Sequence, residues 1–441
     1  MSEEATLDEF VEESEKPEVS EPTVPDSWRV TRADELMEIT RGASPRPKGD
    51  PELFGGDIPW VKIGDVDVKN ARYTGDTEDT VTEKGAKKSK LVDSGTLLVS
   101  NSGTCGYPMF AGVQSCVHDG WLILRNYEDI LNPHYLYEYI GWKQNYLKSL
   151  APGSTQINLN TSRMGVLEIN IPPLPEQRKI ATVLSTVDRA IEKTGEIIEQ
   201  SERLRTGVMQ DLFSTGVWNH DEFQETQYGN VPAEWEVETI DEISSHIGSG
   251  GTPSTDEDAY YGGEIAWVKT DDLNSGLVET TKTTITEKGL NESAAKLFPK
   301  GTVVFAMYGG SLGQNGRLGM EATMNQACCG IVADESKIDP YFLHQHLIHR
   351  KQQLTALSAG THQQNISQSM IEKFEVFVPS LEEQSEMIEI LQDIETMIVR
   401  NDRQREQLQR LKQGLQQDLL SGTVRTTDTK IQVPDKIAQH G

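Results

Sequence analysis

The sequence predicts an α+β fold built by tandem duplication: each copy is a mixed α/β domain followed by a long helix, and the two helices pair as an antiparallel coiled coil. Three observations predict this fold. The 441-residue sequence aligns with itself at an offset of 207 residues, each copy begins with short strand-like runs bounded by Gly-rich turns, and each ends in a Pro-free run with coiled-coil spacing.

The repeat divides the chain into six segments. We expect an acidic disordered tail over residues 1–24, mixed α/β domains over 25–175 and 217–378, spacer helices over 176–216 and 379–422, and a C-terminal tail over 423–441. The first segment carries a net charge of −8 and has few apolar residues to bury, which is typical of disorder.

The two copies share a frame but differ between its anchors. The segment Gly55–Lys62 matches Gly262–Lys269, and Gly153, Gln156 and Asn158 match Gly360, Gln363 and Asn365. Between these anchors the offset falls to 204, where Thr82–Gly85 matches Thr286–Gly289, and then it recovers. We therefore expect a common scaffold that carries different loops.

A long helix is expected at the end of each copy. It opens after Pro172–Pro175 or Pro379–Leu381 and runs without Pro to Gly216 or Gly422, which suit a helix stop. Apolar residues recur at spacings of four and three, as in a coiled-coil seam: Ile180, Leu184, Val187, Ile191, Ile198, Leu204, Val208 and Leu212, then Met387, Leu391, Ile394, Ile398, Leu408, Leu411, Leu415 and Leu419.

A helix from Glu176 to Phe213 would span about 57 Å at about 1.5 Å per residue, which is more than one small domain requires. Its expected partner is the equivalent helix of the other copy, in an antiparallel pair that holds the two domains apart. The alternative is that each helix packs on its own domain alone. Thr194 and Asn401 occupy equivalent polar seam positions, where they would fix the register.

The chain is strongly acidic: 69 Asp and Glu residues against 41 Lys and Arg residues give a formal net charge of −28. No run of about 18 apolar residues exists, which argues against a membrane protein, and the N-terminal sequence lacks the basic and apolar regions of a secretory signal. We therefore expect a cytoplasmic protein. Acidic residues spread over otherwise ordinary globular sequence indicate a halophilic host.

Motifs for catalysis are absent from the sequence. It contains no GxxxxGK[ST], GxSxG or HExxH, and its four cysteines lack metal-ligand spacing. His344, His346 and His349 have helical spacing but no convincing partner, so no metal site is expected. The segment Asn132–Tyr135 resembles the Asn-Pro-Pro-Tyr motif of amino-methyltransferases, but its second Pro is missing. Its counterpart is Asp339–Phe342, so both segments are expected to be helix N-caps with Pro at the first helical position.

Each copy contains motifs in a characteristic order. In the first copy they are Gly55–Lys62, Gly153–Asn158 and Ile171–Gln177, and in the second copy they are Gly250–Ser254, Tyr260–Val268 and Thr361–Ile366. This order resembles the DNA specificity subunit of type I restriction-modification systems. The resemblance covers roughly residues 25–422, and it departs from the pattern where Ser380 and Glu382 stand in place of the prolines of the first copy.

The resemblance implies two target-recognition domains joined by antiparallel spacer helices, with no catalysis by this chain. Methyltransferase (M) and restriction (R) subunits would dock on it and act on double-stranded DNA. S-adenosylmethionine, ATP and Mg²⁺ would belong to those partners, and no cofactor is expected here. Two related domains on a rigid spacer predict two half-sites about one helical turn apart. Diverged loops predict that this bipartite site is asymmetric.

Base recognition needs amides, hydroxyls or guanidinium groups on loops, with cations on phosphates. Phosphate contact is expected of Lys62 and Lys269, and base-edge contact of Ser100, Asn101, Ser102, Tyr308 and Ser311. Gln156, Asn158, Gln363 and Asn365 follow a Gly and suit either role, although turn hydrogen bonding explains them equally well. The only dense basic cluster, Lys84, Lys87, Lys88 and Lys90, fits phosphate contact or a plain solvated surface.

Two other functions remain open: an N6-adenine DNA methyltransferase, and a coiled-coil adaptor that does not bind DNA. The missing cofactor motif argues against the first, and two loop-rich domains argue against the second. The negative charge opposes phosphate binding, but molar salt weakens counterion release, so contacts would depend on hydrogen bonds, shape and displaced water. We expect Asp256, Glu257 and Asp258 to lie away from the DNA.

Overall fold

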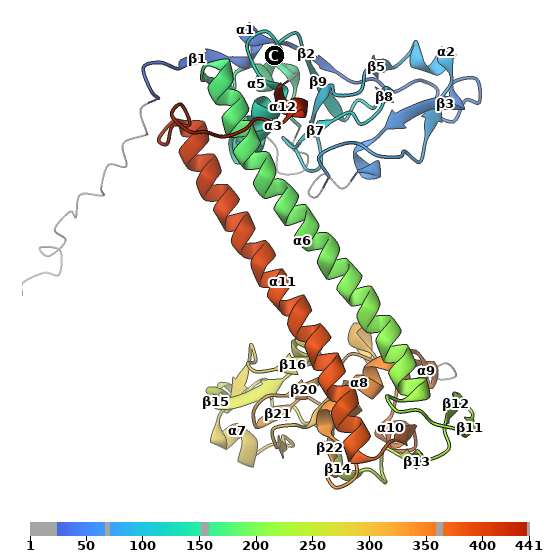
Figure 1. Cartoon of the computed structure of the whole chain (residues 1–441). Helices are drawn as coiled ribbons and strands as arrows, with labels where there is room; N and C mark the ends of the chain where they lie inside the picture. The colour runs from blue at the N-terminus through green and yellow to red at the C-terminus, as the bar shows by residue number, and fades with distance from the viewer. Residues whose placement is uncertain (1–23, 67–70, 151–157, 359–364, 439–441) are drawn as a thin grey trace, which may run out of the picture. The chain divides into compact units, whose positions relative to one another are not determined.

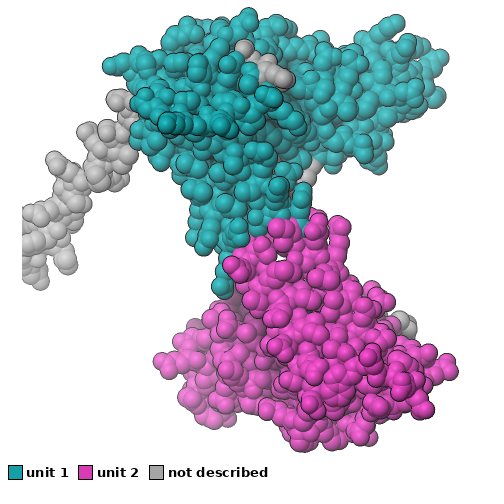
Figure 2. Space-filling model, viewed as in Figure 1, with its two compact units in different colours: residues 1–196, 402–441 teal, residues 197–401 magenta. Residues whose placement is uncertain are grey.

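The structure is a computed structural model that describes residues 24–66, 71–150, 158–358 and 365–438. The chain divides into two compact units (Figure 2): residues 1–196 with 402–441 form unit 1, and residues 197–401 form unit 2. Each unit contains one mixed α/β region and parts of two long helices, α6 (Leu174–Thr215) and α11 (Leu381–Ser421). The predicted acidic tail lies almost wholly outside the described residues.

The α/β region of unit 1 is built on small sheets. β1 (Arg29–Arg32) pairs with β10 (Glu168–Ile171); a second sheet has the order β2 (Glu38–Arg41), β9 (Trp121–Arg125), β6 (Leu97–Ser100), β7 (Pro108–Phe110); a third has the order β4 (Thr80–Val81), β3 (Phe54–Val61), β8 (Ser115–Val117), β5 (Lys90–Val92). The shorter helices are α1 (Ala33–Leu36), α2 (Glu83–Ala86), α3 (Pro133–Trp142), α4 (Gln144–Ser149), α5 (Thr161–Gly165), α12 (Asp435–Ala438) and the 3-10 turn η2 (Ile63–Asp65).

Unit 2 repeats this plan. β11 (Phe223–Thr226) pairs with β12 (Gly229–Pro232), and β13 (Glu236–Thr239) with β23 (Glu375–Val378); a five-stranded sheet has the order β14 (Ser244–Ser249), β22 (Cys328–Ala333), β19 (Val303–Ala306), β20 (Asn315–Leu318), β16 (Leu277–Val278); a four-stranded sheet has the order β17 (Thr284–Ile285), β15 (Tyr261–Val268), β21 (Ala322–Met324), β18 (Leu297–Phe298). The shorter helices are α7 (Glu287–Asn291), α8 (Pro340–His349), α9 (Lys351–Ala356), α10 (Gln368–Glu372) and the 3-10 segments η3 (Asp258–Tyr260), η4 (Thr270–Ser275) and η5 (Gly309–Ser311).

Strand registers confirm the duplication. Arg29 opposes Ile171 in unit 1 and Glu236 opposes Val378 in unit 2, so both members of the pair shift by 207 residues. The predicted slip to an offset of 204 also appears: Phe54 opposes Val81, whereas Tyr261 opposes Ile285. The second copy is therefore three residues shorter between the two paired strands, and the strand pairing itself is the same in both copies.

Helix ends form as the sequence predicts. The side chain of Asn132 accepts hydrogen bonds from the backbone N–H groups of the first turn of α3, and Asp339 does the same for α8, each with Pro at the start of the helix. Gly216 and Gly422 follow α6 and α11 with φ of +74° and +85°, a backbone conformation that favours glycine. The N-cap prediction for the Asn-Pro and Asp-Pro segments is confirmed.

The two long helices pair in each unit, which confirms the predicted antiparallel helix pair. In unit 1 the first half of α6 lies beside the second half of α11 (Figure 1), and Ile180 and Leu184 share a core with Leu419. In unit 2 the last half of α6 meets the first half of α11, where Leu212 shares a core with Leu391. Each α/β region therefore packs against both helices, not against its own alone.

Two predicted seam residues are wrong. Leu204 and Leu411 are equivalent positions, and each side chain is 51% exposed. The seam follows Ser201 and Arg205 instead, because spacings of three and four from the buried Ile198 lead to those polar positions. The equivalent polar residues Thr194 and Asn401 donate hydrogen bonds to carbonyls of their own helices, those of Ala190 and Met397.

No described helix has the combination of length and apolar composition that crossing a bilayer requires.

Candidate nucleic-acid interface

A carboxylate joins the start of each long helix to its α/β region. Glu176 accepts a hydrogen bond from Trp28 Nε1 at 3.1 Å and is bound by two nitrogens of Arg425 at 2.8 and 2.7 Å. Burial opposes the ionisation of Glu176, but the bonds from Arg425 and Trp28 outweigh it and lower the pKa of this carboxyl. In unit 2, Glu383 likewise accepts from Trp235 Nε1 at 2.9 Å. Both α/β regions are thus attached to the helices in the same way.

The glutamine that follows each of these glutamates ties down the next helix. Gln177 Oε1 accepts from the backbone N–H of Asn132 at 2.8 Å, while its Nε2 donates to the carbonyls of Ile130 and Pro172. Gln384 makes the same three bonds, to Asp339, Lys337 and Pro379. The glutamine that ends the motif Ile171–Gln177 and its counterpart Gln384 therefore have a structural role, because they hold the starts of α3 and α8 against the long helices.

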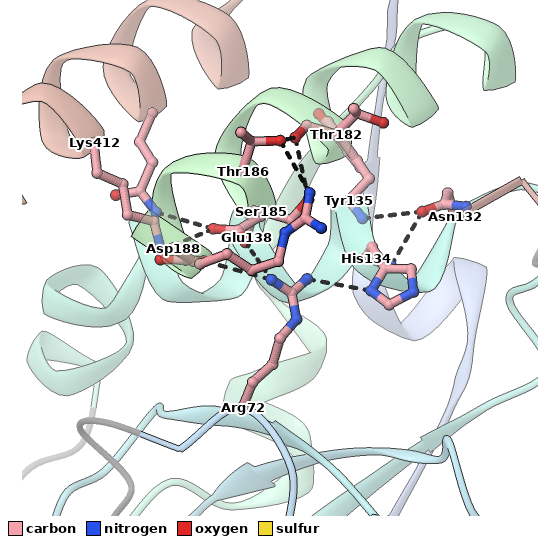
Figure 3. A network of polar contacts seen from close by, with 12 residues as sticks. Arg72, Asn132, His134, Tyr135, Glu138, Thr182, Ser185, Thr186, Asp188 and Lys412 are labelled. Atoms are coloured by element: carbon pink, nitrogen blue, oxygen red, sulfur yellow. Dashed lines mark hydrogen bonds and ion pairs between the residues drawn. The ribbon is translucent and has the colours of Figure 1, made fainter. Parts of the chain in front are cut away.

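A buried charge network forms the junction between the α/β region and the helix pair of unit 1 (Figure 3). Glu138 of α3, 1% exposed, lies between Arg72 at 3.2 Å and Lys412 of α11 at 3.1 Å. Asp188 of α6 completes it, 2.6 Å from Lys412 and 3.4 Å from Arg72. His134 Nδ1 lies 3.2 Å from the Arg72 guanidinium. Four segments remote in sequence are held together here.

The junction of unit 2 has the same positions with less charge. Arg205 lies 3.1 Å from Glu395 and 2.8 Å from the Gln345 amide oxygen, and Tyr341 donates to Glu395 at 2.7 Å. Each of the first three residues stands 207 positions from its counterpart in unit 1. Sequence analysis missed both junctions because charged residues on a helix read as solvent-facing. One sequence signal could have indicated these junctions: Arg205 and Lys412 are cations at equivalent positions of the two copies, 207 residues apart.

The predicted site residues of unit 1 meet around one turn, residues 118–120. The backbone N–H of His118 donates to Val61, next to Lys62, and the N–H of Asn101 donates to Gly120. The carbonyl of Asn101 in turn accepts from Leu159 at 2.8 Å, next to Asn158. The recognition edge of unit 1 is defined here as residues 62, 100–102, 118–120 and 158.

Unit 2 brings its own predicted residues together with the same bonds. The N–H of Asn325 donates to Val268, that of Met307 to Ala327, and that of Ile366 to Met307. The recognition edge of unit 2 is residues 269, 307–311, 325–327 and 365. The fold therefore assembles, in each unit, a set that is scattered over about 100 residues of sequence.

The edges differ in their side chains. In unit 1, Lys62 Nζ lies 2.7 Å from Asp79, 3.6 Å from Asp65 and 3.7 Å from Glu78, and the hydrogen bond to Asp79 raises its pKa. In unit 2, Lys269 Nζ lies 4.9 Å from the Trp267 ring centre and makes no ion pair with a described carboxylate. Of the two matching lysines, only Lys269 is free of carboxylate partners among the described residues.

The predicted base-edge residues hold the turn after β6 in unit 1. Ser100 donates to the Thr104 carbonyl, and Asn101 Nδ2 donates to the Asp119 carbonyl at 2.9 Å. Both side chains are fully buried, whereas Ser102 is partly exposed. Asn158 is exposed. The two outward residues are those with room to reach a base, and base contact stays a prediction.

In unit 2 the turn after β19 carries Tyr308 and Ser311, both partly exposed. Tyr308 precedes η5, and Ser311 ends it. Asn365 is half-buried beside them. Gln156 and Gln363 lie outside the described residues, so the structure places neither.

The glycine motif of unit 2 packs against this edge. A Cβ on Gly250 would lie 2.2 Å from the Met324 carbonyl oxygen, and one on Gly251 would lie 2.1 Å from the Ala294 carbonyl oxygen. Neither position has room for a side chain. The segment that follows β14 therefore approaches the backbone of Met324 and Ala294 directly.

Metal and thiol chemistry have no apparent site in the described part of the chain. No three or more His, Cys, Asp or Glu residues are grouped there so as to hold a metal ion. All four cysteines are buried, and burial raises the pKa of Cys328 and Cys329 to about 12. These thiols stay protonated at neutral pH, unlike those of reactive cysteines.

Two stretches of the chain, residues 25–203 and 232–410, match the family model of the type I restriction modification DNA specificity domain. The chain belongs to this family. As in the sequence repeat, one DNA specificity domain falls in each copy. The first match ends within α6 and the second within α11, so the C-terminal ends of both helices lie outside the matched residues.

Relatives support this assignment, one of them over 95% of the chain. The type I restriction enzyme MjaVIII specificity subunit of Methanocaldococcus jannaschii is 26% identical over 426 residues, covering 95% of this chain and 97% of the relative. The EcoR124I/EcoR124II specificity subunit of Escherichia coli is 25% identical over 185 residues, 41% of this chain and 45% of the relative. The specificity-domain similarity thus extends from an archaeal to a bacterial protein.

Solved structures share the fold. The S subunit of a type I restriction-modification system from M. genitalium superposes with a TM-score of 0.56 at 17% identity, covering 90% of this chain and 96% of that one. A chain from a study of complex assembly and conformational transition of a type I system gives 0.60 at 15% identity, covering 91% and 100%.

Proposed function

We propose that this chain reads a bipartite, asymmetric DNA site for a type I restriction-modification system. Membership of the DNA specificity family identifies it as a sequence-recognition subunit and a non-catalytic component. One observation carries the bipartite part of the proposal: the two units build their recognition edges with the same backbone bonds but different side chains. One scaffold with two different edges suits two different half-sites.

The contacts proposed for recognition divide into two kinds. Lys269 and the exposed lysines of unit 1 would bind phosphates, which position the protein without reading sequence. Ser102, Asn158, Tyr308 and Ser311 would approach base edges, because they carry donors and acceptors at the outer side of each edge. Lys62 would contribute less than predicted from sequence, since three carboxylates already surround its ammonium group.

The proposed partners are double-stranded DNA, methyltransferase (M) subunits and restriction (R) subunits. The relatives are named as specificity subunits of type I restriction enzymes, and the solved system named above concerns complex assembly. S-adenosylmethionine, ATP and Mg²⁺ would be held by these partners, which carry out adenine methylation and cleavage. Neither alternative is favoured, since the family match points to DNA specificity and away from a lone methyltransferase or a coiled-coil adaptor.

The test is a map of N6-methyladenine in the host genome, with and without this gene. We expect an asymmetric two-part motif to lose methylation in the deletion strain and to regain it when the gene is restored. A chimaera that carries another subunit's residues 217–378 should change one half of the motif only. An unchanged methylation map in the deletion strain would refute the function.

We further propose that the chain works in the cytoplasm of a cell with high internal salt. The net charge of −28 and the exposed carboxylates Asp256, Glu257 and Asp258 support this, because self-repulsion at low salt destabilises a compact chain. Thermal unfolding in increasing KCl should show a melting temperature that rises into the molar range. A melting temperature that falls or stays constant would contradict the proposal.

A further inference from the structure

Exposed cations gather on one lobe of unit 1. The lysine patch consists of Arg46, Lys48, Lys84, Lys87, Lys88 and Lys90, all exposed. These residues lie on the segment before β3, on α2, and on the residues from α2 to the start of β5. Segments 46–52 and 83–90 together hold these six cations and three carboxylates, in a chain whose net charge is −28. One of the six, Lys84, forms an ion pair with Glu52, which leaves five cations without such a partner among the described residues. The patch is therefore a local reversal of the molecule's overall sign.

The lysine patch is continuous with the recognition edge of unit 1. Lys88 Nζ donates to the Arg46 carbonyl at 3.1 Å, which ties α2 to the segment carrying Arg46 and Lys48. This segment reaches the edge through Ser44, whose hydroxyl donates to Asp119 at 2.5 Å. Burial lowers the pKa of His118, the charge of Asp119 opposes this, and the cations Lys48, Arg41 and Lys62 add smaller lowering effects. Positive charge thus borders the edge directly.

The matching lobe of unit 2 has the opposite sign. Segments 253–259 and 287–297, which occupy the equivalent places, hold five carboxylates and two lysines. Asp256, Glu257 and Asp258 are exposed there. Of the two lysines, Lys288 is within 3.9 Å of Glu292 and over the Tyr260 ring, so its charge is partly compensated. The equivalent segments therefore differ by six charges, from a net +3 in unit 1 to a net −3 in unit 2.

We propose that the two units hold DNA unequally: unit 1 anchors the phosphate backbone through the lysine patch, whereas unit 2, apart from Lys269, binds its half-site mainly through contacts that release no counterions. This inference rests on the proposed function. Each phosphate neutralised by a lysine makes binding fall more steeply with salt, by about 0.9 in the slope of log affinity against log salt. Salt sensitivity should therefore reside in unit 1.

The test compares two charge-matched variants of the full chain. K48Q/K87Q/K90Q removes three lysines of the patch, and K282Q/K296Q/K300Q removes three exposed lysines of unit 2. None of the six side chains makes a hydrogen bond or ion pair with a described residue, so neither variant should disturb the fold. The measurement is fluorescence anisotropy with a labelled double-stranded DNA of arbitrary sequence across a range of KCl concentrations.

We expect the patch variant to lower the salt slope by about 2.7, so that over an about fourfold rise in salt the wild type loses about 40-fold more affinity than the variant. The unit 2 variant should keep a slope close to that of the wild type. Equal slopes for both variants, with the wild type still binding, would overturn the inference and leave the proposed function intact. If the wild type binds no duplex and the deletion strain keeps its methylation, both fail.

Discussion

Nε2 of His220 lies 3.0 Å from Oε1 of Glu383, where the other unit places Arg425 against Glu176. Each contact joins the segment that follows one long helix to the first turn of the other. The two contacts occupy equivalent places but differ in chemistry. Arg425 binds both oxygens of Glu176, whereas His220 contacts one oxygen of Glu383, and only the histidine loses its charge near neutral pH. One attachment is therefore sensitive to pH and the other is not.

The first prediction follows from this difference. Burial lowers the pKa of His220, but the hydrogen bond and charge of Glu383, with those of Glu234, outweigh it and raise the pKa above its ordinary value of 6.5. The stabilisation is fully present below pH 6.5 and is lost as the pH rises through the raised pKa. In H220Q, the melting temperature should lose this pH dependence.

The matched control for His220 is R425Q. Arginine stays charged across this range, so R425Q should lower the melting temperature by a similar amount at every pH from mildly acidic to mildly alkaline. Differential scanning fluorimetry across that range checks both variants. A wild-type pH profile that H220Q leaves unaltered would show that the His220 contact does not titrate as described.

The second prediction concerns Gln177. Its side chain is fully buried, and truncation in Q177A removes the hydrogen bonds that it makes with the Asn132 N–H and with two carbonyls. We expect a loss of about 2–3 kcal/mol in the free energy of unfolding, measured by urea denaturation. Q413A, which truncates an exposed glutamine of α11, should change it by less than about 0.5 kcal/mol. Equal effects of the two variants would contradict the proposed role of Gln177 in holding α3.

The third prediction addresses the charge network of unit 1. Replacing Lys412 in K412M leaves Glu138 and Asp188 with Arg72 as their cation, and should cost about 3–5 kcal/mol in urea denaturation. R410A, on the same helix, breaks an exposed ion pair with Glu406 and should cost at most about 1 kcal/mol. A K412M variant as stable as R410A would mean that the network does not hold the junction.

The fourth prediction separates true seam residues from apparent ones. Leu184 is fully buried and Leu204 is 51% exposed, although both fit a coiled-coil spacing. L184A should lose about 2–5 kcal/mol in the free energy of unfolding, whereas L204A should stay within about 0.5 kcal/mol of the wild type. Chemical denaturation checks both, and a large loss in L204A would place that leucine in the seam after all.

Residue patterns were sufficient to predict most of the architecture. The repeat at an offset of 207 residues predicted that the two copies form equivalent strands. The strand pairing confirms this, since Arg29 opposes Ile171 in one copy and Glu236 opposes Val378 in the other. Caps at Asn132 and Asp339 were predictable because they depend on neighbours within four residues. The helix pair was predictable because an apolar stripe longer than one domain needs a partner.

What the sequence determined by itself is the repeat, the element types and the family to which they belong, since these depend on local spacing and on order along the chain. Tertiary structure alone decided that Arg205 and Lys412 enter the seam, because a buried charge is stable only beside carboxylates such as Glu395, Glu138 and Asp188 that arrive from other segments. It also decided that the equivalent lysines differ, because Asp65, Glu78 and Asp79 surround the Lys62 ammonium group, whereas Lys269 forms no ion pair with a described carboxylate.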